Sequence, residues 1–250
     1  MSHAVLAAVL AALVAGLGGL LVPELIARVP EPKPKPEPES EPEDSSDGGP
    51  DAEPPKTAYA DIAARPGLGW RSAVVSTAVG ALLGATFGLD WPLLWLVPLV
   101  PVAVALSVVD WHTRLLPRVV VVPATLAAVV VVTAVGLATD RDALVRALAA
   151  MVAVRSFFWV LWFVRSAGMG FGDVRLAAPV GLVLGWVGWG AVAIGVWTSF
   201  VAFVGPALAL ALVRRDRVML KKSFPFGPFM VIGALVGLVW GTALAGRIWG

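Results

Sequence analysis

The sequence predicts an all-α polytopic membrane protein with about eight transmembrane helices. Of its 250 residues, 58% are hydrophobic and only 14% are charged, and the mean hydropathy is +0.85. Soluble domains rarely have this composition. Apolar stretches of about 20 residues recur along the chain, and each is long enough to cross a bilayer as a helix. The short alternating strands of a membrane barrel do not occur in the sequence.

The first apolar span, residues 4–22, is expected to remain in the chain as a transmembrane helix with its N-terminus outside. A cleaved signal peptide needs a basic start, and no Lys or Arg precedes this span. Basic residues follow it instead, at Arg28, Lys33 and Lys35, and the positive-inside rule places them in the cytoplasm. We therefore assign residues 1–30 to a first transmembrane helix.

Residues 31–66 are expected to form a disordered cytoplasmic linker rich in proline and glutamate. In residues 31–56 prolines remove amide donors, and the alternating charges resist collapse into a core. A solvated tether is favoured over a docking arm for this composition. A short interfacial helix at residues 59–65 is expected to end the linker.

The remainder, residues 67–250, is expected to form a seven-helix membrane domain. The apolar-length criterion gives these spans at 72–89, 92–109, 119–138, 143–164, 174–186, 191–213 and 230–244. Basic residues fall in alternate loops, which the positive-inside rule assigns to the cytoplasm: Arg114, Arg118, Arg165, Arg214, Arg215, Arg217, Lys221 and Lys222. Asp110 and Asp173, at the ends of two spans, then lie on the same cytoplasmic face.

These two acids are the candidate catalytic residues, because carboxylates are costly at the edge of a membrane span. Two carboxyl groups that share a proton can hydrolyse a peptide bond: one takes a proton from water and the other donates to the leaving amine. Alone, Asp173 is an ordinary helix N-cap and Asp110 an ordinary boundary charge. Beside Asp173, Gly170 and Gly172 lack Cβ atoms, so the backbone can bend and approach an extended substrate closely.

The helix dipole suggests how the pair shares its proton. Asp110 is expected to end a helix and Asp173 to begin one, which favours charge on Asp173 by about 0.3–1 kcal/mol. Asp173 is then the ionised base and Asp110 the protonated acid, provided that the helix does not continue past Asp110. Arg155, inside a span, is expected to face the bundle interior and bond backbone carbonyls, with a counter-ion role as the alternative. His112 is expected in a solvated loop rather than as a third catalytic group.

Four segments, in order along the chain, resemble the prepilin peptidases, the membrane aspartic proteases that trim type IV pilin precursors. Residues 168–176, GMGFGDVRL, resemble the family's glycine–any–glycine–aspartate motif. Asp110 followed by Leu116-Pro117 is similar to the family's first aspartate motif, and residues 25–30 are similar to its exit from the first span. The late proline–phenylalanine–glycine–proline–phenylalanine segment is matched by Pro225, Phe226, Gly227, Pro228 and Phe229.

The resemblance implies a membrane-embedded aspartic endopeptidase with Asp110 and Asp173 as its catalytic pair. It implies removal of a short basic leader from prepilin or pseudopilin precursors, at the cytoplasmic face of the bacterial inner membrane. An active-site loop or substrate approach is expected at Gly170, Gly172, Pro225, Phe226, Gly227 and Pro228. The expected partners are these precursors and the lipid bilayer, without nucleic acid, cofactor or metal.

Two departures from the family pattern limit this interpretation. Many members carry a cysteine-rich insert after the first span, linked to N-methylation of the product, whereas this chain has 0 Cys and a Pro/Glu linker there. N-methyltransferase activity and a zinc site are therefore not expected. Ala167 occupies a position that is often acidic in relatives.

Two other functions stay open. One is a relative of the archaeal preflagellin peptidases or another intramembrane protease, with the same chemistry and a different substrate. The other is a non-proteolytic ion- or proton-coupled transporter or scaffold whose acids bind a cation or proton. Against the latter, the sequence shows no internal inverted repeat, which many transporters have.

Overall fold

The computed structural model describes residues 3–31, 58–164, 169–214 and 225–249, with the side chains of 206–214 excepted. Within these ranges the regular structure is α-helical, so the predicted all-α class is confirmed. In chain order the helices are α1 (His3–Leu20), α2 (Val22–Ala27), α3 (Tyr59–Ala63), α4 (Leu68–Phe87), α5 (Leu93–Thr113), α6 (Arg118–Ala138), α7 (Arg141–Val164), α8 (Phe171–Val187), α9 (Trp189–Arg214) and α10 (Gly227–Trp249).

The long helices α1 and α4 to α10 lie at the positions of the predicted spans. Six of them, α1, α4, α5, α6, α7 and α10, are long and apolar enough to cross a membrane by length and composition. Helix α8 has 17 residues, and α9 has 26 residues, of which Trp189–Gly205 have described side chains and are apolar. The multi-pass membrane character is therefore confirmed.

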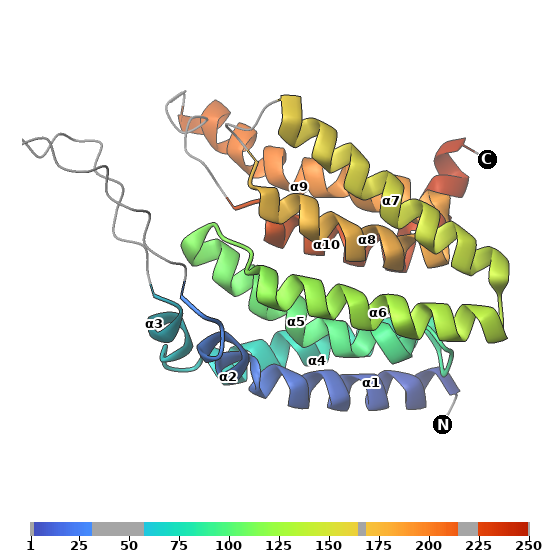
Figure 1. Ribbon diagram of the computed structural model, residues 1–250, viewed down its shortest axis with the longest axis horizontal. Helices are drawn as coiled ribbons and strands as arrows, with labels where there is room; N and C mark the ends of the chain where they lie inside the picture. The colour runs from blue at the N-terminus through green and yellow to red at the C-terminus, as the bar shows by residue number, and fades with distance from the viewer. Residues whose placement is uncertain (1–2, 32–57, 165–168, 215–224, 250) are drawn as a thin grey trace, which may run out of the picture.

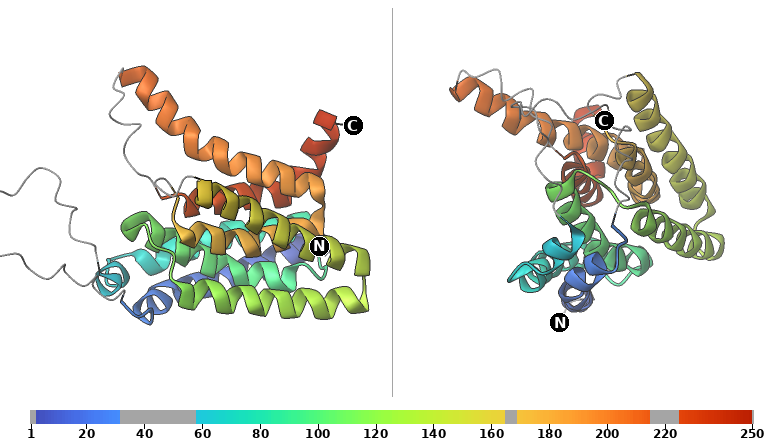
Figure 2. Two further views of the ribbon diagram at one scale, coloured as in Figure 1. Left: turned by 45° about the horizontal axis from the view of Figure 1, so that its top comes forward. Right: turned by 60° about the vertical axis from the view of Figure 1, so that its left-hand side comes forward.

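The long helices run side by side between two ends of the molecule (Figure 1). One end, here called the α3 end, carries α2, α3, the connection 114–117 and the first residues of α6, α8 and α10. The opposite end carries both chain termini and the connections that follow α6 and α8. Helices α1 and α4 form one side of the bundle, α7 and α9 lie on the other, and α5 runs between them (Figures 1 and 2).

Small residues hold the helices together in pairs. Along the contact of α1 with α4 a small residue recurs every fourth position, and the buried members are Ala7, Ala11, Ala15, Gly19, Ser72, Ser76, Gly80 and Gly84. A Cβ added to Gly80 would lie 2.5 Å from the carbonyl oxygen of Ala11, so the two backbones are in direct contact. In an apolar solvent such close packing replaces the hydrophobic effect as the attraction between helices.

The pairs α7–α8 and α9–α10 are built in the same way. A Cβ on Gly181 of α8 would lie 2.6 Å from the carbonyl oxygen of Ala150 in α7. In the other pair, a Cβ on Gly241 of α10 would lie 2.6 Å from the Cα atom of Ala191 in α9. Helices α8 and α10 therefore each pack backbone to backbone against a partner helix.

A second, smaller core fixes the end of α5. It is formed by Val22, Ile26, Val29, Tyr59 and Ile62, packed on Ala105 and Val109 of α5. The Glu31 carboxylate accepts hydrogen bonds from the backbone N–H groups of Tyr59, at 2.6 Å, and Ala60, at 3.3 Å. Burial, and secondarily the Glu31 charge, raises the pKa of Tyr59, whose hydroxyl is hydrogen-bonded to Thr113.

Of the predicted linker, residues 32–57 lie outside the described residues, while residues 58–66 include α3 and join this second core. Ala167 and most of the predicted basic cluster after α9 also lie outside the described part of the chain.

Replacing Gly80 with alanine is expected to lower the free energy of unfolding by about 1–3 kcal/mol, because the added Cβ overlaps the Ala11 carbonyl. Gly246→Ala is the matched control, since a Cβ there meets nothing within 4 Å. The measurement is thermal or denaturant unfolding of each variant in detergent. Equal losses in the two variants would contradict the packing described for α1 and α4.

Candidate active site

Asp110 is buried at the α3 end of the bundle, where α5 meets the start of α10. Its side chain is only 4% exposed. Its Oδ2 atom accepts a hydrogen bond of 2.9 Å from the backbone N–H of Gly227. Gly227 is the first residue of α10, and the free N–H groups at a helix N-terminus stabilise a negative charge. A carboxylate at this position is therefore supported by a helix from a segment 117 residues away in sequence.

Glycine is required at position 227 because of how closely the backbone approaches Asp110. A Cβ on Gly227 would lie 2.7 Å from Asp110 Oδ2. The preceding residue, Phe226, is buried and packs its ring against Phe200 and Phe203, with ring centroids 5.3 and 5.2 Å apart. The aromatic contacts thus fix the segment that presents the Gly227 N–H.

Asp173 is the third residue of α8 and is likewise buried, at 6% exposure. Its Oδ2 atom accepts a hydrogen bond of 3.2 Å from the N–H of Gly170. Gly170, not Asp173, is the N-cap residue, so Asp173 has the role of the acidic N3 residue in a capping box. The helix begins at Phe171, three residues earlier than the sequence predicted.

The two buried carboxyl groups lie close enough for the charge of Asp110 to act on Asp173. Their elements also touch directly: a Cβ on Gly172 would lie 2.8 Å from Cβ of Leu116, in the connection that follows α5. Within the described residues, Oδ1 of Asp110 and Oδ1 of Asp173 have no hydrogen-bond partner. Each acid therefore uses one oxygen to bind a helix N-terminus and keeps the other for a proton or a water molecule.

The premise of the predicted proton assignment is wrong. Helix α5 continues to Thr113, three residues past Asp110, and the Asp110 carbonyl accepts a helical hydrogen bond from the Arg114 N–H. The dipole effect decays within the last turn. Moreover, each acid accepts one N–H from a helix N-terminus, so the dipoles do not distinguish Asp110 from Asp173.

The two glycines before Asp173 differ in what they do. Gly170 has an extended backbone, φ −73° and ψ 148°, and a Cβ there would meet Asp173 Oδ2 at 3.7 Å, an ordinary contact. Gly172 lies inside the first turn of α8, where contact with Leu116 leaves no space for a Cβ. Neither glycine bends the chain as the sequence suggested, because both have right-handed or extended backbone.

His112 and Arg155 differ from expectation. His112 lies in the last turn of α5 rather than in a loop; its Nδ1–H donates to the Val108 carbonyl at 2.8 Å, and its Nε2 accepts from Arg65. Arg155 is exposed on α7, so it is neither directed into the bundle nor a counter-ion of the two acids. Sequence periodicity could not assign its face, because α7 is apolar nearly all round.

An apolar cavity of about 520 Å³, whose lining includes neither Asp110 nor Asp173, lies between the helices, a feature that the sequence did not predict. It is lined by α4, α5, α6, α8 and α10. At the α3 end its lining includes Ser107, Val108 and Trp111 on α5, together with Pro228 next to Gly227. In the described ranges, no group of three or more His, Cys, Asp or Glu side chains could hold a metal ion.

Fold and site together define a polytopic helical membrane protein with two buried acids at one end of its bundle. The sequence model of the type IV leader peptidase family matches residues 96–241, which include both acids and the Phe226–Gly227 segment. The chain belongs to this family, and the resemblance seen in its motifs is confirmed.

Curated relatives named "Prepilin leader peptidase/N-methyltransferase" are similar over most of this chain. The protein of Stutzerimonas stutzeri is 30% identical over 178 residues, covering 70% of this chain and 60% of the relative. That of Burkholderia pseudomallei (strain 1026b) is 31% identical over 179 residues, covering 70% and 56%. That of Pseudomonas aeruginosa is 29% identical over 181 residues, covering 71% and 61%. The chain thus spans less than two thirds of the length of these relatives, and no solved structure matches it significantly.

The difference between the two glycines can be tested directly. Gly172→Ala is expected to lower the free energy of unfolding by about 1–3 kcal/mol, because its Cβ overlaps Leu116. Gly170→Ala, the matched control, is expected to lose well under about 1 kcal/mol, since its Cβ has an ordinary contact distance. Unfolding of both variants in detergent measures the difference. A Gly170→Ala variant less stable than Gly172→Ala would refute this description of the loop.

Proposed function

We propose that the protein is a membrane-embedded aspartic endopeptidase that removes the short basic leader from type IV prepilin-like or pseudopilin precursors. The observation that carries the proposal is the burial of two carboxyl groups, Asp110 and Asp173, at the ends of elements that touch where Gly172 meets Leu116. Membership of the type IV leader peptidase family and the printed names of its relatives support the substrate class.

In the proposed mechanism the two carboxyl groups share one proton. The ionised member takes a proton from a water molecule as the water oxygen attacks the scissile carbonyl. The protonated member gives its proton to the carbonyl oxygen. As the C–N bond breaks, the member that took the water proton gives it to the nitrogen of the leaving amine, and the other member regains its proton from a hydroxyl of the tetrahedral intermediate. The free Oδ1 atoms of Asp110 and Asp173 suit these transfers, while the Oδ2 atoms remain bonded to Gly227 and Gly170. Because the pair is coupled, a pH–rate profile would report on both residues jointly.

The apolar cavity offers a place for the hydrophobic helix that follows the cleavage site. Its lining includes Trp111, the residue after Asp110, and Leu176, three residues after Asp173, and continues along α5 toward the opposite end of the bundle. A substrate helix in this cavity would have its first residues at the two acids and the leader beyond the α3 end. The leader would then be cut off next to the membrane boundary.

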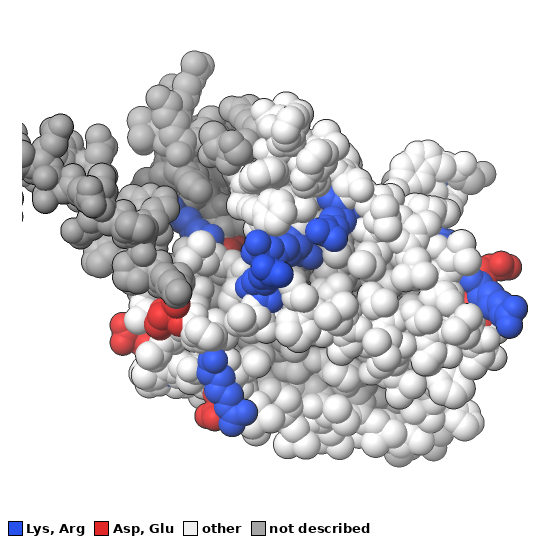
Figure 3. Space-filling model, viewed as in Figure 1, with Lys and Arg blue, Asp and Glu red and all other residues white. Residues whose placement is uncertain are grey.

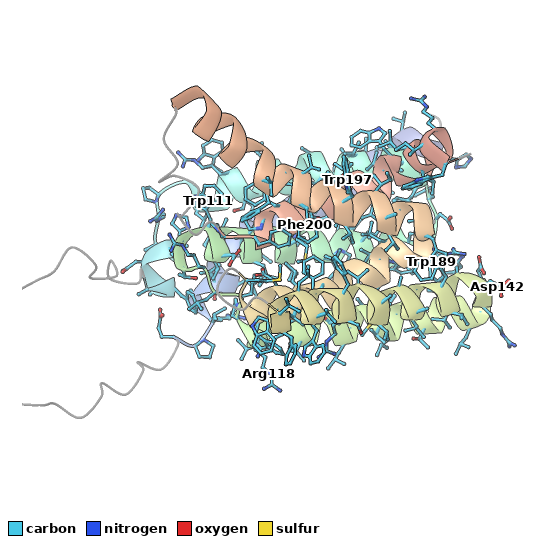
Figure 4. The ribbon with its side chains drawn as sticks, turned by 90° about the horizontal axis from the view of Figure 1, so that it is seen from above. Trp111, Arg118, Asp142, Trp189, Trp197 and Phe200 are labelled. Carbon is cyan, nitrogen blue, oxygen red and sulfur yellow. The ribbon has the colours of Figure 1, made fainter. Side chains whose placement is uncertain are left out.

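We propose that the α3 end faces the cytoplasm of a bacterial inner membrane. Exposed arginines at this end, Arg65, Arg114 and Arg118, agree with the positive-inside rule. In Figure 4, Arg118 lies toward this end and Asp142 at the other. The proposal does not extend to N-methyl transfer, because the chain has 0 Cys where the family resemblance leads us to expect a cysteine-rich insert.

The direct test is co-expression of a tagged prepilin with the wild type, Asp110→Asn or Asp173→Asn. Each substitution is expected to lower the cleavage rate by about 100-fold or more, the contribution of a general acid or base. Asp142→Asn is the matched control, since Asp142 is exposed at the opposite end of the bundle. Cleavage that survives both active-site substitutions, at equal amounts of protein in the membrane, would favour a transporter or scaffold.

Filling the cavity tests how the substrate binds. Ala103→Trp is expected to raise KM roughly tenfold for a full-length precursor, because the indole occupies the space proposed for the substrate helix. Cleavage of a short soluble peptide spanning the leader junction should change little. Ala149→Trp, on the outward face of α7, is the control for a tryptophan added to a membrane helix. An equal loss with both substrates would mean that the cavity does not receive the helix.

A further inference from the structure

Three arginines stand on the outward face of the bundle toward the α3 end: Arg118 at the start of α6, Arg155 on α7 and Arg175 on α8. Arg118 and Arg155 are exposed, and Arg175 is half-buried. Figure 3 shows basic side chains gathered on the face where α6, α7 and α8 lie in Figure 1. Figure 4 shows the Arg118 side chain pointing away from the bundle.

The helix contacts place the three residues at a similar depth. Helices α7 and α8 are antiparallel, with Gly181 against Ala150 and Gly185 against Ala147. This register places Arg155 beside Leu176, the residue that follows Arg175. Leu116 contacts Gly172, and α6 and α8 both run away from this contact in the same direction. Arg118 comes two residues after Leu116, and Arg175 comes three residues after Gly172, so the two arginines lie at a similar depth. Three positive charges from separate helices therefore share one level.

None of the three has an acidic partner in the part of the chain that the structure describes. The ion pair found there is formed by Arg28 and Glu24, on α2. Arg175 lies over the Phe171 ring, 4.9 Å from its centroid, and Phe171 packs edge-on against Trp162 of α7. Arg118 and Arg155 make no hydrogen bond to another described residue. The three charges are thus directed outward and are not neutralised by described acidic side chains of the protein.

The surroundings of the patch are apolar. On α7, Trp159 is 46% exposed and Phe163 is 71% exposed, and their rings stack on each other. Tryptophan side chains such as Trp159 gather where a membrane protein meets the lipid headgroups. An arginine facing a membrane needs an anion, and its planar guanidinium matches the oxygens of a phosphate.

We propose that Arg118, Arg155 and Arg175 form a binding site for the phosphodiester headgroup of an anionic phospholipid, whose acyl chains pack along the outward face of α7. The exposed apolar side chains around the three arginines favour a lipid as the source of the phosphate. A basic leader peptide, the substrate in the proposed function, would be repelled by the three charges. The site lies near the start of α8, which carries Asp173, so a bound lipid would stabilise the element that presents one of the two acids.

The test is lipid retention by the full-length protein in nanodiscs of equal phosphatidylglycerol and phosphatidylcholine, counted by native mass spectrometry. R118Q/R155Q/R175Q should retain phosphatidylglycerol more weakly, by about fivefold for each charge removed. R71Q/R141Q/R247Q removes the same number of exposed arginines elsewhere and should retain it as the wild type does. The lysine triple variant R118K/R155K/R175K should recover part of the binding, because it keeps the charge but not the planar fork.

Unchanged phosphatidylglycerol retention in R118Q/R155Q/R175Q would overturn the proposal, as would an equal loss in the control triple variant. A change of oligomeric mass with lipid retention unaffected would also overturn it, because the face would then bind protein. If R118Q/R155Q/R175Q aggregates, the number of phosphatidylglycerol molecules retained is measured instead for R118Q, R155Q and R175Q separately. None of these readouts depends on proteolysis, so failure here leaves the proposed peptidase activity untouched.

Discussion

A carboxylate enclosed by apolar helices must find its hydrogen bonds within the protein, and this requirement organises the α3 end of the molecule. Asp110 and Asp173 lie on different helices, and both meet the requirement in the same way. Each accepts one backbone N–H at the start of a helix, α10 for Asp110 and α8 for Asp173. The position of the acids therefore depends on where α8 and α10 begin.

The small-residue pairs hold these helices in the bundle. Helix α8 is held against α7 through Gly181 and Gly185, and α10 is held against α9 through Gly237 and Gly241, in each case with backbone in close contact. Helix α5, which carries Asp110, is fixed at the same end by the second core of α2 and α3. The hydrophobic effect does not draw helices together in lipid, so these packing contacts hold α5, α8 and α10 in place relative to one another.

Much of this could be predicted from the sequence, and the limits have a physical origin. Apolar runs fixed the number and approximate place of the long helices, and acids inside such runs are conspicuous, so Asp110 and Asp173 were found as candidates. Membrane helices are apolar on nearly every face, so their sequence does not reveal which side is buried. The outward position of Arg155 was missed for that reason. The contact of Gly227 with Asp110 was missed because it joins segments far apart in the chain, and no local pattern encodes such a contact.

The equivalent support of the two acids matters for the chemistry that we propose. Peptide hydrolysis moves a proton from water to the leaving amine, so the residue that acts as base must later release that proton and the residue that acts as acid must regain one. A carboxyl with far stronger internal hydrogen bonds than its partner would hold its charge and resist this exchange. Asp110 and Asp173 each have one N–H donor at a helix N-terminus and one oxygen free of described protein partners. Similar support lets the proton return to its starting place after each turnover, so that neither acid has to move away from the helix end that holds it.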